Sequence, residues 1–170
     1  MRKTRKMTLL ANFLAIAIVL NIIESLVPVI PVPGAKLGFA NIVTLIILYV
    51  YSFKDSATIT ILRVLLVSLL TGKLLGPVFY MSFSGALFAT FAMGFFKKTN
   101  FFGVLGVSVI GSIFHCIGQI IAGIFVIGSS AVIFYLPIML MLSIPAGIVT
   151  GLITQRFLVI WQTWHNEFEN

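Results

Sequence analysis

The chain has 170 residues, of which 60% are hydrophobic and 9% are charged, and its formal net charge is +7. With a mean hydropathy of +1.17, this composition excludes an ordinary soluble domain and indicates an integral membrane protein. The basic residues stand at the ends of apolar runs and form no continuous face, so nucleic acid is not an expected partner.

Six apolar runs predict an all-α bundle of six transmembrane helices, because a helix needs about 20 residues to cross about 30 Å of hydrocarbon. The runs lie at 8–27, 37–51, 56–71, 77–96, 101–127 and 131–160, within a single membrane domain of residues 1–170. Pro77 suits the first turn of the fourth helix. The last run is long and contains Pro137 and Pro145, which predicts a kinked or tilted helix.

The distribution of basic residues predicts that both termini face the cytoplasm, since cytoplasmic loops carry an excess of Lys and Arg. With this orientation the inner side holds Arg2, Lys3, Arg5, Lys6, Lys54, Lys97, Lys98 and Arg156. The outer side holds only Lys36 and Lys73. We therefore expect a multi-pass protein of the cell membrane.

A proline-rich segment separates the first two runs. Pro28, Pro31 and Pro33 must end the first helix, and Gly34 frees the chain to reverse. This reversal brings Lys36 and Asn41 to the mouth of the second helix.

Polar residues of several helices are predicted to reach one level in the outer half of the membrane. From the helical rise, Glu24 lies about 24 Å and His115 about 21 Å from the inner starts of their helices, and Asn41 about 6 Å below its outer start. The cluster comprises Glu24, Lys36, Asn41, Lys73, His115 and Gln119. Buried ionisable groups in a membrane are costly unless paired or facing water, so the cluster is a candidate substrate site.

Structural interpretations of the same residues remain open. Glu24 could pair with Lys36 or Lys73 and fasten the loop, and both lysines could snorkel to the interface. His115 and Gln119 share a helix face and could hydrogen-bond a neighbouring helix.

Arg63 lies deeper, about 10 Å above the inner start of the third helix. It could bind an anionic part of a ligand, or it could bond carbonyls at a helix kink. The excess of Arg63, Lys36 and Lys73 over Glu24 favours an anionic or zwitterionic ligand.

Catalysis by this chain is not expected. The four acidic residues form no paired-carboxylate cluster for magnesium, the single cysteine has no partner for a metal site, and no phosphate-binding glycine loop is present. We expect neither a metal nor a cofactor, and an ATP-driven process would require a partner ATPase.

Three pairs of small residues at i, i+4 spacing could bring helix backbones close together. They are Ala11 and Ala15, Gly118 and Ala122, and Gly147 and Gly151. Each could pack within the bundle or form a docking face for another membrane subunit.

Three segments resemble the Gx transporter family, also catalogued as heptaprenyl diphosphate synthase component I. They are PGAKLGFANIVTLIILY from Pro33, RVLLVSLLTG from Arg63 and HCIGQ from His115. The family is similar to the substrate-capturing S components of energy-coupling factor transporters. The resemblance implies a lid at 28–38, a coupling face at Ala11 and Ala15, and as partners a membrane T subunit and two ABC-type ATPases.

An alternative is a non-catalytic membrane anchor or regulatory subunit of a prenyl diphosphate synthase. A stand-alone carrier is disfavoured, because the chain has neither paired repeats nor an acidic relay. The expected ligand of an importer is a small anionic or amphipathic molecule, such as a vitamin or an isoprenoid or quinone precursor.

Overall fold

The computed structural model describes residues 3–26 and 40–169. In these residues the chain forms six α-helices and one 3₁₀ helix, and no strand. The helices are α1 (Lys3–Leu26), α2 (Asn41–Val50), α3 (Phe53–Leu70), α4 (Pro77–Lys98), α5 (Val104–Ile127), η1 (Ser130–Tyr135) and α6 (Leu136–Glu169). The all-α prediction is confirmed for this part of the chain.

Four helical stretches in the described residues are long and apolar enough to cross a membrane. They lie at Lys3–Ser25, Pro77–Lys98, Val104–Ile127 and Ser130–Trp164. Such stretches are those of a membrane protein. α3 has 18 residues but carries Lys54, Asp55 and Arg63.

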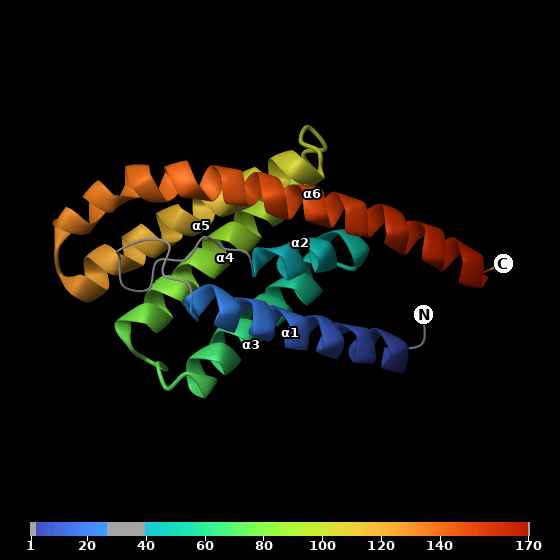
Figure 1. The fold of residues 1–170 in the computed structure, drawn as a ribbon, viewed down its shortest axis with the longest axis horizontal. Coiled ribbons are helices and arrows are strands. Elements are labelled where there is room, and N and C mark those ends of the chain that lie inside the picture. The colour runs from blue at the N-terminus through green and yellow to red at the C-terminus, as the bar shows by residue number, and fades with distance from the viewer. Residues whose placement is uncertain (1–2, 27–39, 170) are drawn as a thin grey trace.

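α2 is shorter than the predicted second run. The run at 37–51 was expected to cross the membrane, but α2 begins at Asn41 and has 10 residues, about 15 Å of helix. Residues 37–39 of that run lie outside the described part of the chain. Most side chains of α2 are buried, and the helix contacts each of the other α-helices. α2 is therefore a short helix at the centre of the bundle (Figure 1).

The ends of α3 and α5 also differ from the prediction. α3 begins at Phe53 instead of 56, because the Ser52 hydroxyl caps it by accepting a hydrogen bond from the backbone N of Asp55 at 3.2 Å. α5 begins at Val104 instead of 101, because Gly103 is extended at its N-cap.

The last predicted run divides into two elements. Residues from Ser130 to Tyr135 form η1, and α6 then continues to Glu169, beyond the predicted end at 160. Pro145 lies inside α6 and has no N–H to donate to the carbonyl of the preceding turn. Figure 1 shows α6 bending along its course, as this proline leads one to expect.

The beginning of α1 and the end of α6 lie at the same end of the molecule (Figure 1). Aromatic rings join them, with the Phe13 centroid 6.0 Å from that of Phe157 and 6.3 Å from that of Trp161. α5 packs extensively on both α4 and α6. The end of α1, the end of α3 and the start of α4 surround a small polar cavity.

Candidate functional site

Arg63 and Asn41 form a hydrogen bond inside the bundle, although the sequence placed them at different depths. Arg63 Nη2 donates to Asn41 Oδ1 at 3.4 Å, and only 2% of Arg63 and 5% of Asn41 are exposed. The two residues are level because the short α2 leads into α3, which returns antiparallel beside it. The contact shows that the two residues share one level of the bundle, and the depth of that level in the membrane stays a prediction.

Several buried donors in this pair have no hydrogen-bond partner among the described residues. They are Nε and Nη1 of Arg63 and Nδ2 of Asn41. A buried polar group without a partner costs about 1–3 kcal/mol, and a charged one costs more. Arg63 is thus held inside the bundle and does not reach the surface of the protein.

Glu24, which is half-buried near the end of α1, lies close to this pair. It is close enough to act electrostatically on the Arg63 guanidinium and on Cys116 of α5. The last turns of α1 therefore lie near α3, with which α1 packs. The predicted pairing of Glu24 with Lys36 stays a prediction, because Lys36 and the expected lid at 28–38 lie outside the described residues.

His115 and Gln119 are buried on α5, with 4% and 0% exposure, and face α4 at Gly85. A Cβ on Gly85 would lie 2.7 Å from Gln119 Cγ and 2.8 Å from the His115 carbonyl oxygen. Glycine at this position lets α4 approach the polar face of α5. Ser82 lies one turn earlier on the same face of α4, and it lines a cavity together with residues of α3.

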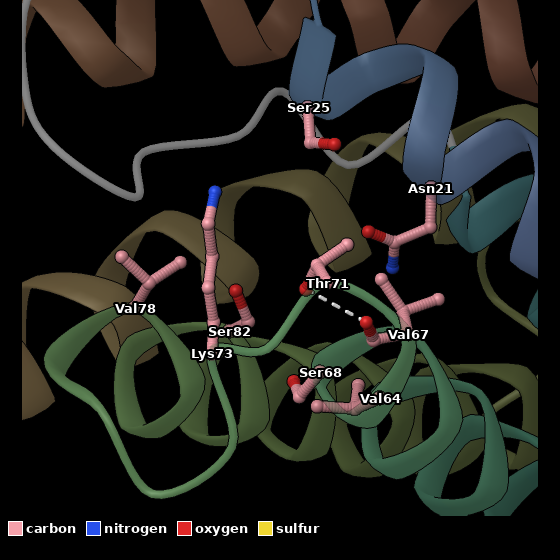
Figure 2. Close-up of a pocket in the computed structure, with 9 residues that line it drawn as sticks. All are labelled: Asn21, Ser25, Val64, Val67, Ser68, Thr71, Lys73, Val78 and Ser82. Atoms are coloured by element: carbon pink, nitrogen blue, oxygen red, sulfur yellow. Dashed lines mark hydrogen bonds between the residues drawn. The ribbon is translucent and has the colours of Figure 1, made fainter.

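A small polar cavity lies between α1, α3 and α4 (Figure 2). Its volume is about 30 Å³, room for one or two water molecules. The cavity is lined by Asn21, Ser25, Val64, Val67, Ser68, Thr71, Lys73, Val78 and Ser82. Figure 2 shows Asn21 and Ser25 reaching it from α1, opposite Ser68 and Ser82, with the extended Lys73 side chain at one side. A ligand of several heavy atoms must widen this space.

The predicted site residues therefore fall into neighbouring groups. Glu24, Asn41 and Arg63 come together, Lys73 lines the adjoining cavity, and His115 with Gln119 lies behind Gly85 of α4. The two alanines predicted to contact a partner, Ala11 and Ala15, lie elsewhere, on the exposed face of α1.

Sequence reasoning missed most of the hydroxyl groups in this interior. Thr60 Oγ1 lies 3.0 Å from Thr44 Oγ1 and 3.3 Å from Thr90 Oγ1, which links α2, α3 and α4 one turn from the Arg63–Asn41 pair. Threonine occurs throughout apolar helices, so its type gave no signal. Asn21 could have been found from the sequence, because it precedes Glu24 by three positions and the two residues therefore share one helix face.

These groups can bind a ligand by hydrogen bonds and charge. Within 3–26 and 40–169, no group of three or more His, Cys, Asp and Glu residues could hold a metal ion. Arg63 and Lys73 supply two positive charges against the one carboxylate of Glu24. The described site is therefore rich in donors and carries an excess of positive charge.

Comparison with known proteins agrees with the family resemblance of the three sequence segments. No curated protein and no solved structure matches the chain. Residues 13–157 match the family described as heptaprenyl diphosphate synthase component I. This match covers most of the 170 residues, from α1 into α6, so the chain belongs to the heptaprenyl diphosphate synthase component I family.

Proposed function

We propose that this chain is the substrate-binding membrane subunit, or S component, of an ATP-driven importer of the energy-coupling factor type. The observation that carries the proposal is the gathering of buried polar side chains from α1 to α5 in an otherwise apolar bundle. Polar groups inside a membrane protein are costly unless they serve one another or a ligand. The substrate is a small anionic or amphipathic molecule, such as a vitamin or an isoprenoid or quinone precursor.

The binding site is formed by Glu24, Lys36, Asn41, Arg63, Lys73, His115 and Gln119. The cationic side chains and the Asn41 amide attract the anionic part of the substrate, and His115 and Gln119 hydrogen-bond its polar edge. The cavity beside Lys73 is the point from which the site widens to admit the substrate.

The subunit is a single domain of six helices in the prokaryotic plasma membrane, and both termini are cytoplasmic. Its partners are a membrane T subunit and two ABC-type ATPases, which use the ATP. The exposed small residues Ala11 and Ala15 on α1 support a close contact with the T subunit.

The family description favours a second candidate function. A family named for a component of heptaprenyl diphosphate synthase suggests a non-catalytic membrane anchor or regulatory subunit for a prenyl diphosphate synthase. In that role the chain holds a soluble synthase at the membrane, and its polar interior is structural.

Native mass spectrometry of the complex separates the two candidates. The full chain, tagged and expressed with its host's own subunits, is purified in mild detergent. We expect the T subunit and ATPases to accompany it, together with a small molecule released on activation. A soluble prenyl synthase in their place would reject the importer and support the anchor.

The same measurement tests the binding residues. Asn41→Ala and His115→Ala should reduce the released small molecule while the variants remain folded. Thr58→Ala is the matched control, because Thr58 is exposed and its hydroxyl bonds only to the Lys54 carbonyl of its own helix. Equal amounts of ligand in all these proteins would remove the proposed site.

A further inference from the structure

The environment of Arg63 is incomplete in the described residues. A guanidinium presents a planar fork of N–H donors and has no acceptor. Only one bond engages it here, the 3.4 Å bond from Nη2 to Asn41 Oδ1, while Nε and Nη1 have no hydrogen-bond partner. With 2% of the residue exposed, bulk water does not replace those partners.

Asn41 shares this incompleteness. Its Oδ1 accepts from Arg63, which leaves the Nδ2 amide group to donate, and Nδ2 also has no partner in the described residues. The carboxamide is buried, with 5% exposure. Both residues thus present donors that no acceptor among the described residues engages.

Charge leads to the same conclusion. Glu24 acts on Arg63, but Lys73 lines the cavity next to it, so the described groups have one positive charge in excess. Val64 and Val67, which follow Arg63 by one and four positions, line that cavity. Lys73 is exposed and Arg63 is buried, so a bound anion would meet one cation at the rim of the cavity and one inside the bundle.

We propose that the substrate carries an anionic group, a carboxylate or a phosphate, that binds to the Arg63 guanidinium and the Asn41 amide, with the rest of the molecule extending into the cavity beside Lys73. This inference rests on the proposed function, because it assigns the substrate class of the same site. The planar fork of arginine matches the oxygen atoms of carboxylate and phosphate, which accept charge-assisted hydrogen bonds.

Asn41→Asp provides a sharp test, because it changes the charge with almost no change in shape. The new carboxylate lies where Oδ1 already meets Arg63 Nη2, so it supplies an anion from within the chain. The variant should unfold at a higher temperature than the wild type. Its response to added anion should be at least about tenfold weaker, since charge-assisted hydrogen bonds to the anion are lost.

The experiment follows thermal unfolding of the detergent-purified full chain at constant ionic strength set by sodium chloride. Three probes are titrated separately: sodium acetate, inorganic phosphate, and acetamide as the neutral isostere of acetate. In the wild type, an anion should raise the unfolding temperature to a plateau, and acetamide should not. If acetate raises the unfolding temperature more than phosphate does, the anionic group of the substrate is a carboxylate. If phosphate raises it more, that group is a phosphate.

Two further variants complete the test. Arg63→Lys keeps the charge but loses the fork, so its half-saturating anion concentration should rise about tenfold. Lys98→Gln removes an exposed cation at the end of α4 and should titrate as the wild type does. If Asn41→Asp does not fold, Arg63→Lys alone decides the matter.

Equal responses to acetate and acetamide, or an unchanged anion titration in Arg63→Lys, would overturn the inference. These outcomes need no partner subunit and no knowledge of the substrate. Failure to purify the T subunit and ATPases would therefore reject the importer while leaving the anion site standing. A neutral transported molecule that binds Arg63→Lys as tightly as the wild type would reject the anion site alone.

Discussion

Two pairs of small residues with the same i, i+4 spacing occupy opposite environments. Gly147 and Gly151 lie where α6 packs against α5: a Cβ on Gly147 would lie 2.9 Å from Val109 Cα, and one on Gly151 would lie 2.9 Å from Leu105 Cα. Ala11 and Ala15 lie on the exposed face of α1 and pack against no other described helix there. Identical spacing therefore accompanies an internal contact in α6 and an exposed surface in α1.

Hydrogen bonds strengthen this contrast. At the glycine pair, the Ser108 hydroxyl lies 2.8 Å from the Gly147 carbonyl oxygen and 2.6 Å from Thr150 Oγ1, so polar bonds accompany close backbone packing. Around the alanine pair, large apolar side chains point outward, among them Ile16 with 52% and Val19 with 55% exposure. Small residues thus mark a close approach of two helices, but the residues around them decide whether the second helix belongs to the same chain.

Gly147→Leu should have the largest effect. The new side chain would collide with Val109 Cα and with Ser112 Oγ, 2.8 Å from the added Cβ, so α5 and α6 must separate. We expect a loss of about 1–3 kcal/mol or more in the free energy of unfolding, measured in detergent. Gly103→Ala is the control, because no atom lies within 4 Å of its added Cβ. A Gly147→Leu protein as stable as this control would show that α5 and α6 do not pack closely here.

Ala15→Leu should leave stability within about 0.5 kcal/mol of the wild type, because the residue is exposed. If α1 is the coupling face, its larger side chain prevents close approach of a partner helix, and capture of the T subunit should fall about tenfold or more. Ala131→Leu, at an exposed alanine of η1, should not reduce capture. Undiminished capture by Ala15→Leu would place the coupling face on another helix.

Much of the fold could be predicted because apolar runs mark helices by length and composition. Pro77 at the start of α4 and Pro145 inside α6 lie where the sequence placed them. The helix ends differ from the ends of the apolar runs where local signals compete with hydropathy. The cap between Ser52 and Asp55 extends α3 into a polar stretch, and α6 continues past the predicted membrane boundary at 160.

The candidate site was less predictable, because depth along a helix depends on where that helix starts and ends. A second helix assumed to span the membrane placed Asn41 far from Arg63, whereas the short α2 brings them together. Buried Arg63 and His115 were detectable because polar groups are rare in apolar runs. The contact of Gly85 with Gln119 depends on which faces of α4 and α5 meet, and spacing within one helix cannot show that.

The smallest expected effect concerns an ion pair that joins the beginning of α1 to α3. Lys6 Nζ lies 2.8 Å from Asp55 Oδ2. Burial alone would raise the pKa of Asp55, but hydrogen bonds from Lys6 and Ser52 and the Lys6 charge outweigh it, so the pKa is lowered. A carboxylate with a lowered pKa in the folded state stabilises the fold above the unfolded pKa, about 3.9, and this contribution is lost as the pH falls through the folded value. For a partly exposed pair we expect about 0.2–1 kcal/mol.

The difference in unfolding free energy between wild type and Asp55→Asn should therefore be present at pH 7 and vanish under acid conditions. Lys6→Gln should lower the free energy of unfolding at pH 7 by a similar amount. If the difference between wild type and Asp55→Asn persists at low pH, the pair does not hold α1 to α3.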